Sequence, residues 1–162
     1  MAAAPTDRPT VRAYEAEDRG AIVSMLANRD PWRRLGYTER DWHTLLTPPL
    51  RGREAWVLER GGEPMGIALV RLQFLRGDYL ELFAIAPGCE RRGLGRLLLA
   101  EVEHKVFART RNFFVCVSDF NHAARRFYAR SGYQQVGTLG DLLVAGSAEL
   151  LLRKTIDASR LS

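Results

Sequence analysis

Short apolar runs alternate with amphipathic ones along the chain, which predicts strands followed by helices. Residues 11–14 predict a first strand, and a helix begins at about Asp18, a residue type suited to the N-cap position. An irregular stretch follows over 28–37. Thr38 then begins a second helix, which ends before Pro48-Pro49 because proline interrupts helical hydrogen bonding.

The middle of the chain predicts a meander of three strands. Residues 54–60 and 63–75 are separated by the Gly61-Gly62 pair, which is a strong hairpin signal. A third strand follows over 79–86. After it, a loop rich in glycine and arginine leads into an amphipathic helix over 94–109.

The remaining elements alternate again. Residues 113–117 predict a buried strand, 123–130 a helix, and 133–136 and 149–154 two further strands. The complete order is β–α–α–β–β–β–α–β–α–β–β. This order predicts a mixed α/β (α+β) domain with mostly short connections.

The chain has 162 residues, 46% hydrophobic and 27% charged, which is typical of one globular domain. We expect that domain to span 10–156, with a disordered N-terminus over 1–9 and a frayed C-terminus over 157–162. Apolar runs fall short of the ~20 residues of a membrane span, and the first residues lack the pattern of a secretory signal. Only Cys89 and Cys116 are cysteine, so we expect a cytoplasmic protein with neither a disulfide framework nor a zinc site.

The formal net charge is +5, and it comes from arginine. Of 24 basic residues two are lysine, Lys105 and Lys154, which leaves 22 arginines. An arginine excess suits phosphate or nucleic-acid binding, because the guanidinium group matches phosphate oxygens. The arginines are scattered, however, so a compositional habit without function is the competing interpretation.

The loop over 86–96 fits neither of two familiar phosphate-binding templates. Gly88 and Gly93 have the spacing of a P-loop, but leucine stands where the P-loop lysine is required. The dinucleotide fingerprint fails because Leu98 replaces its third glycine. These positions disfavour nucleotide hydrolysis and dinucleotide binding.

The same loop nevertheless suits an anion. Its backbone N–H groups precede a helix N-terminus, where the helix dipole favours negative charge. Arg91, Arg92 and Arg96 add cationic side chains. A pyrophosphate is the ligand that this arrangement favours, and the alternative is a plain strand-to-helix turn.

Two segments resemble the motifs of a known family. Residues 85–96, Ile-Ala-Pro-Gly-Cys-Glu-Arg-Arg-Gly-Leu-Gly-Arg, resemble the acetyl-CoA-binding motif of the GNAT N-acetyltransferase superfamily, and 121–133, Asn-His-Ala-Ala-Arg-Arg-Phe-Tyr-Ala-Arg-Ser-Gly-Tyr, resemble its second signature. One helix and one strand separate them, as in the family. The resemblance implies a single mixed, mostly antiparallel sheet of about six to seven strands flanked by about four helices.

The resemblance also implies how acetyl-CoA is held. Backbone groups near the end of the third meander strand would pair with the pantetheine arm, backbone N–H groups of the loop would bind the pyrophosphate, and an asparagine would contact the pantetheine. The corresponding residues are Phe83, Ala84, Ile85, Arg91, Arg92, Gly93, Leu94, Gly95, Arg96 and Asn121. Two positions differ from related motifs: Glu90 stands where the family has Gln or Arg, so Arg91 or Arg92 would compensate, and Cys116 stands where ribosomal-protein-alanine acetyltransferases carry a glutamate.

The implied reaction is direct attack of a primary amine on the acetyl thioester in a ternary complex. Glu81 is the best-placed base, and the apolar residues around it would raise its pKa. Strand alternation puts Glu81, Phe83 and Ile85 on one face, unless a bulge breaks the pattern. The alternatives are an ordinary solvent-facing charge at Glu81 and a water relay as the base.

Three aromatic residues complete the candidate site. Tyr128 matches the family's general acid, which protonates the departing thiolate, and core packing is its alternative role. Trp32 and Tyr37 lie on the loop where family members bind the acceptor, and packing of a lid is the alternative there. The three histidines show no metal-ligand spacing.

We therefore expect acetyl-CoA as co-substrate, a small-molecule or peptide amine as acceptor, no metal and no membrane. Exposed strand edges in the family make a homodimer a modest expectation. The alternative functions are a non-catalytic CoA-binding regulator and a nucleic-acid-binding module on the same fold. No RNA-reading aromatic pattern supports the latter.

Overall fold

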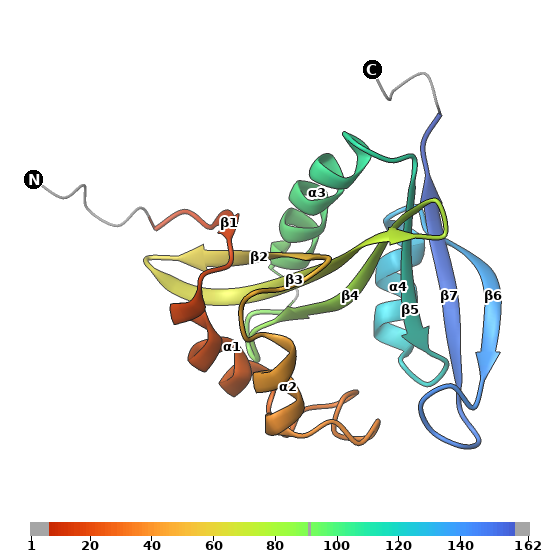
Figure 1. Cartoon of the computed structure of the whole chain (residues 1–162), viewed down its shortest axis with the longest axis horizontal. Helices are drawn as coiled ribbons and strands as arrows, with labels where there is room; N and C mark the ends of the chain where they lie inside the picture. Colours follow the sequence, from red (N-terminus) through yellow and green to blue (C-terminus); the bar gives the residue numbers. More distant parts are fainter. Residues whose placement is uncertain (1–6, 91, 158–162) are drawn as a thin grey trace, which may run out of the picture.

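The computed structural model, which describes residues 7–90 and 92–157, contains one seven-stranded sheet in the order β1-β2-β3-β4-β5-β7-β6 (Figure 1). Its strands are β1 (Thr10–Ala13), β2 (Arg53–Arg60), β3 (Glu63–Phe74), β4 (Gly77–Ile85), β5 (Asn112–Ser118), β6 (Gln134–Gly140) and β7 (Ala148–Thr155). All neighbouring strands are antiparallel except β4 and β5.

Four α-helices accompany the sheet, and a 3-10 turn at Ala16–Asp18 leads into the first. They are α1 (Arg19–Leu26), α2 (Glu39–Leu45), α3 (Leu94–Phe107) and α4 (His122–Arg130). The fold class and the element order predicted from the sequence are thus confirmed, with boundaries shifted by a few residues. The predicted disordered ends fall largely outside the described residues, as does Arg91.

The helix starts agree with the sequence at one position and differ at another. Thr38 caps α2 as predicted, because its hydroxyl accepts a hydrogen bond from the Asp41 N–H and the Asp41 carboxylate accepts one from the Thr38 N–H. Asp18 precedes α1 but its side chain does not cap it. That carboxylate instead accepts two hydrogen bonds from Arg12 at 2.8 Å and is buried, so it joins the 3-10 turn to β1.

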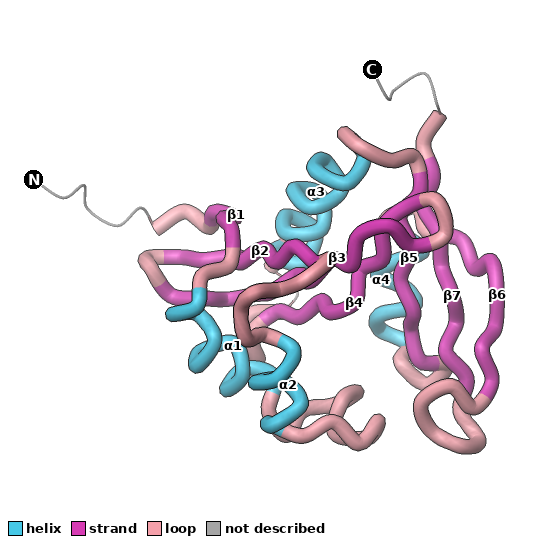
Figure 2. Tube along the Cα trace, viewed as in Figure 1, coloured by secondary structure: helices cyan, strands magenta, loops and turns pink. Residues whose placement is uncertain are grey.

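The helices cover both faces of the sheet, so the protein has two hydrophobic cores (Figures 1 and 2). One core joins the sheet to α3 and α4, and the apolar stripe predicted for α3 is buried in it: Leu94, Leu98, Val102 and Val106. The other core joins the sheet to α1 and α2 around Ile22, Leu26 and Trp42. The central strands β3 and β4 therefore contribute apolar side chains to both cores.

A bulge in β4 sets the direction of its side chains. In the ladder with β3, Leu80 lies opposite Val70. The next paired residue of β4 is Leu82, opposite Leu69, so Glu81 is an extra residue in the strand. Strand alternation beyond Leu80 is consequently broken at Glu81.

The bulge overturns the simple alternation considered for this strand. Phe83 and Ile85 pack in the core of α3 and α4, together with Leu80. Glu81 instead lines a cavity beside α2, on the opposite face. The carboxylate and the two apolar side chains therefore do not share a face.

The strands β4 and β5 are parallel and paired at three positions only. Leu80 opposite Val115 is the last pair, after which the two strands diverge in the manner of a V (Figure 1). Gly77, the first residue of β4, lies directly against the backbone of Asn112. A Cβ at Gly77 would lie 2.8 Å from Asn112 Cβ and closer still to its carbonyl oxygen, so glycine lets the strands meet at the vertex of the V.

Candidate active site

The opening between β4 and β5 exposes strand backbone beside a buried tyrosine. Phe83 of β4 stacks on Phe127 of α4 with ring centroids 5.7 Å apart, and meets Tyr128 edge-on at 6.3 Å. The helix α4 therefore lies against the arm of the V that β4 forms. Beyond Leu80, β4 has no further pairs with β5, which leaves its edge open to an extended ligand.

Tyr128 is almost fully buried, and its side chain carries a hydroxyl group. Only 5% of its surface is exposed, and its ring also packs against Tyr133 at 5.4 Å. Burial raises the pKa of its hydroxyl well above the usual value, so the group remains protonated. Among the described residues no group accepts a hydrogen bond from it, and packing alone does not account for the hydroxyl.

The loop before α3 presents backbone N–H groups at the end of the opening. Gly93 has φ +74, a left-handed conformation that favours glycine, and the helix begins at the next residue. Leu94 is buried, which anchors the first turn, whereas Arg92 and Arg96 are exposed beside it. The predicted contribution of Arg91 lies outside the described residues.

An ion pair accounts for the glutamate that departs from the family motif. Arg29, in the loop after α1, donates hydrogen bonds to the Glu90 carboxylate at 2.8 Å and to the carbonyl oxygen of Ile85 at 2.6 Å. The second Glu90 oxygen accepts the N–H of Gly88 at 2.8 Å. Arg29 therefore balances the charge of Glu90. The prediction named Arg91 or Arg92 for this role, and of these Arg91 lies outside the described residues.

Asn121 caps α4 in this structure. Its side-chain oxygen accepts the N–H of Ala124 at 3.2 Å. This position fixes the start of the helix that carries Tyr128, seven residues later. The residue is therefore placed beside the opening, and its predicted contact with the pantetheine arm stays a prediction.

A cavity of about 330 Å³ lies on the other face of the sheet, beside α2. Both aromatic residues predicted for acceptor binding line it. Trp42 of α2 holds them in place, with Tyr37 stacked on it at 4.8 Å and Trp32 edge-on at 5.7 Å. The full lining is Trp32, Tyr37, Arg40, Asp41, Trp42, Thr44, Leu45 and Glu81.

Glu81 reaches this cavity, but its environment differs from the predicted one. Arg53 donates a hydrogen bond to its carboxylate at 2.6 Å and Arg71 donates another at 3.0 Å. Burial by itself would raise the pKa of Glu81, but these two arginines outweigh it and the pKa lies below the usual value. The predicted rise in the Glu81 pKa is therefore wrong. The prediction considered the apolar neighbours in the same strand, and the sequence does not show that Arg53 and Arg71 of the adjacent strands lie beside the carboxylate.

The sequence analysis missed a second carboxylate near the same space. Glu149, the second residue of β7, is 5% exposed and lies opposite Ser118 of β5, whose hydroxyl donates a hydrogen bond to it at 2.6 Å. Burial raises the pKa of Glu149, and the hydrogen bond from Ser118 only partly opposes this effect. The signal available in the sequence was Glu149, a charged residue directly before the apolar run from Leu150 to Leu152.

The loop over 28–37 crosses the space between the two halves of the sheet. The Arg34 guanidinium lies 3.7 Å from the ring centroid of Phe120, which follows β5. Tyr37, on the same loop, has its pKa raised by burial and then by the charges of Glu81, Glu149 and Asp41. The loop therefore covers a space bounded by carboxylates on both β4 and β7.

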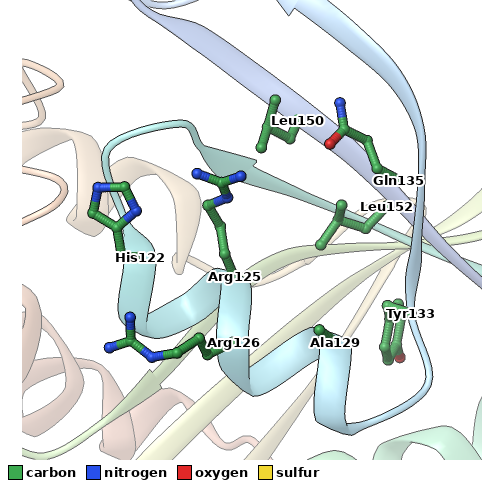
Figure 3. A pocket seen from close by; sticks show the side chains of 8 residues that line it. All are labelled: His122, Arg125, Arg126, Ala129, Tyr133, Gln135, Leu150 and Leu152. Atoms are coloured by element: carbon green, nitrogen blue, oxygen red, sulfur yellow. The ribbon is translucent and has the colours of Figure 1, made fainter.

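Another cavity, of about 400 Å³, lies away from the opening, between α4 and the strands β6 and β7 (Figure 3). Leu150, Leu152, Ala129 and Tyr133 form its apolar part, and His122, Arg125, Arg126 and Gln135 supply its polar side chains. None of the predicted site residues that the structure describes lines it.

Two absences can be stated for residues 7–90 and 92–157. These residues include no group of three or more His, Cys, Asp or Glu side chains arranged to hold a metal ion. No helix among them is long and apolar enough to cross a membrane.

Comparison with known proteins gives a consistent result. A family model described as acetyltransferase (GNAT) family matches residues 10–133. No curated protein matches the sequence.

Several solved structures share the fold. The ribosomal-protein-S18-alanine N-acetyltransferase from Escherichia coli is 18% identical, with a TM-score of 0.75, covering 93% of this chain and 95% of its own. The spermidine N-acetyltransferase from Vibrio cholerae, solved with CoA and spermine, is 16% identical, with a TM-score of 0.74 and coverage of 91% and 95%. An aminoglycoside 6'-N-acetyltransferase complexed with coenzyme A is also 16% identical, with a TM-score of 0.73 and coverage of 91% and 97%.

Proposed function

The chain belongs to the acetyltransferase (GNAT) family and is an acetyl-CoA-dependent N-acetyltransferase, and from this premise we propose how the two faces of its sheet divide the reaction. Acetyl-CoA occupies the opening between β4 and β5. The amine acceptor enters from the opposite face, between α2 and the loop over 28–37. The single observation that carries this division is that β4 has no pairs with β5 after Leu80, which leaves the backbone edge of β4 unpaired between the two faces of the sheet.

The cofactor is held mainly by backbone groups in this proposal. The open edge of β4 pairs with the pantetheine arm, and the N–H groups at the start of α3 bind the pyrophosphate, where the helix dipole favours an anion. Asn121 contacts the arm from the start of α4. The cofactor-binding residues are Phe83, Ala84, Ile85, Arg91, Arg92, Gly93, Leu94, Gly95, Arg96 and Asn121.

The departing sulfur receives its proton from Tyr128. Its hydroxyl is protonated because burial raises its pKa, and its ring contacts Phe83 on the proposed cofactor strand. When the C–S bond of the thioester breaks, a proton from this hydroxyl converts the thiolate to CoA. The phenolate then regains a proton that the new amide nitrogen releases.

The acceptor is a primary amine that carries positive charge when it binds, on a small molecule or a peptide. Glu81 and Asp41 line the acceptor cavity and attract an ammonium group, while Trp32 and Tyr37 offer aromatic faces to it. Since Glu81 is engaged by two arginines, we assign it to binding and positioning rather than to a base of raised pKa. Two solved structures of this fold involve amines of this type: one is a spermidine N-acetyltransferase solved with CoA and spermine, and the other is an aminoglycoside 6'-N-acetyltransferase.

We also extend the proposal to domain, location and assembly. Residues 10–156 form one catalytic domain. A cytoplasmic location is supported by two free thiols, Cys89 and Cys116. A homodimer through β6 is supported by its place at the edge of the sheet, where Val136 and Leu139 are 47% and 38% exposed.

The test of the proposed function is release of CoA. The purified protein is incubated with acetyl-CoA and, separately, spermidine, an aminoglycoside and a peptide that begins with alanine, and the free thiol is measured. The proposal predicts release above the amine-free background with at least one amine. Binding of acetyl-CoA without release for any of them would favour a CoA-binding regulator instead, and salt-dependent binding to RNA would favour the nucleic-acid module.

A further inference from the structure

Four carboxylates surround the space under the loop over 28–37, and three of them each accept at least two hydrogen bonds. Glu81 is held by two arginines. Asp41 caps α2 through Thr38. Asp119 accepts the N–H of Ala148 and the hydroxyl of Ser147. In each case the pKa lies below its usual value, so these groups are weak bases.

Glu149 differs from these three in the number of its hydrogen bonds and in the direction of its pKa shift. Its carboxylate accepts one hydrogen bond, from the neutral hydroxyl of Ser118 to Oε1, and Oε2 has no hydrogen-bond partner in the part of the chain that the structure describes. No arginine or lysine pairs with it among the same residues. At 5% exposure it is also shielded from bulk water.

The position of Glu149 relates it to the reaction. On β5, Phe113, Val115 and Val117 pack in the core of α3 and α4, so the alternating residues Cys116 and Ser118 face the other way. Glu149 is paired with Ser118 in the adjacent strand and shares that face. It therefore lies on the acceptor side of the diverging arm formed by β5.

Two tyrosines show that Glu149 and Glu81 border one space. Burial is the main cause that raises the pKa of both Tyr37 and Tyr79. The charges of Glu81 and Glu149 raise it further at Tyr37, and at Tyr79 they add to the effect of Cys116. Cys116 is affected by Glu149 as well. The two carboxylates thus approach the same groups from opposite arms of the V.

Resting on the proposed function, we propose that Glu149 is the base that removes the proton from the bound ammonium group of the acceptor. Oε2 of Glu149 takes one proton from R–NH₃⁺, which frees the nitrogen lone pair. The nitrogen then forms a bond to the thioester carbonyl carbon, and the C–S bond breaks. Glu149 later returns its proton to solvent, so the net reaction yields the amide, CoA and one proton.

The electrostatic surroundings suit this role. Burial raises the pKa of Glu149, Asp119 adds to the rise by repulsion, and Ser118 opposes it. Tyr37, Tyr79 and Cys116 face it as neutral groups with raised pKa values and do not stabilise its charge. A carboxylate with such a pKa is a better proton acceptor near neutral pH than Glu81.

The test uses Glu149→Gln, which keeps the side-chain shape and can still accept the Ser118 hydrogen bond. With the amine that gives the fastest CoA release by the wild-type protein, we expect kcat to fall about 100-fold, a typical effect of losing a general base, with KM for acetyl-CoA within twofold. The acidic limb of the kcat–pH profile disappears in this variant. Glu63→Gln, an exposed glutamate at the start of β3, is the matched control and leaves both unchanged.

Ser118→Ala gives a second and independent reading. Removal of the one hydrogen bond that lowers the Glu149 pKa moves the acidic limb to higher pH. If Glu149→Gln does not fold, this shift decides, and an unmoved limb overturns the assignment. If the wild-type protein turns over and Glu149→Gln has the same kcat, only the role of Glu149 is overturned. If the wild-type protein releases no CoA, the proposed function and this assignment are both overturned.

Discussion

The Arg29 guanidinium and the Glu90 carboxylate, 61 residues apart in the sequence, lie 2.8 Å from each other at the mouth of the proposed cofactor site. The same arginine reaches the Ile85 carbonyl oxygen at the end of β4, and its guanidinium lies 5.9 Å from the ring centroid of Trp32. One side chain thus joins the end of β4, the anion-binding loop and the acceptor loop. The negative charge of Glu90 next to a pyrophosphate site is balanced by this contact.

Replacing Glu90 tests the electrostatic part of this relationship. Glu90→Gln removes an anion and leaves Arg29 free to attract the pyrophosphate, so we expect the Kd for acetyl-CoA to decrease about three-fold, as for a partly screened charge of about 0.7 kcal/mol. Isothermal titration at low and at high salt measures it. The gain shrinks in high salt, and a gain that is equal in both would contradict the electrostatic explanation.

Tyr128→Phe removes the proposed proton donor and keeps the ring. Because the ring packs against Phe83, Phe127 and Tyr133, phenylalanine preserves the core. We expect kcat to fall by about 100-fold with KM for acetyl-CoA within twofold. Steady-state CoA release measures both constants. Equal turnover in the variant would assign Tyr128 to packing alone.

Glu81→Gln changes how stability depends on pH. The folded pKa of Glu81 is lowered by Arg53 and Arg71, so its contribution to stability is present above the unfolded pKa and is lost as the pH falls through the folded value. We expect the variant to be about 2 kcal/mol less stable than the wild-type protein at pH 7. The difference is smaller at pH 3, where the carboxylate begins to be protonated in the folded wild-type protein.

Urea unfolding at both pH values measures this effect, with Glu63→Gln as the control for an exposed glutamate. A difference that persists unchanged at low pH would show that the negative charge of Glu81 does not carry its contribution to stability.

Two glycines at the ends of the proposed cofactor site respond differently to a methyl group. Gly77→Ala places a Cβ against the Asn112 backbone at the vertex of the V, and we expect a loss of about 2–3 kcal/mol of stability. Gly95→Ala places its Cβ 3.5 Å from the Phe127 ring, an ordinary contact, so we expect a change of less than about 1 kcal/mol. The free energy of unfolding in urea compares them, and equal losses would show that β4 and β5 do not meet as closely as described.

The sequence predicted the features that depend on local pattern. The stripe from Leu94 to Val106 defined the buried face of α3, and the Thr38-Asp41 pair located the start of α2. The fold followed from the order of elements and from two motifs that resemble those of a known family. These features need only neighbouring residues, so a single sequence contains them.

The features that were missed depend on the alignment of strands. The bulge at Glu81 arises from its register with β3, and the arginines that lower the Glu81 pKa come from β2 and β3. Glu149 becomes part of the site only because β7 pairs with β5 beside Ser118. Arg29 and Glu90 meet because the loop after α1 and the loop after β4 lie together, and local spacing gives no sign of such contacts.

The central claim, that acetyl-CoA lies between β4 and β5 and ends at the start of α3, is tested most directly by hydrogen exchange of the backbone amides. Exchange is compared with and without saturating acetyl-CoA. The account predicts slower exchange of the amides of residues 83–85 and 92–96. It predicts little change for the amides of β6 and β7, which border the cavity beside α4. Unchanged exchange at 83–85 and 92–96 in saturating acetyl-CoA would contradict it.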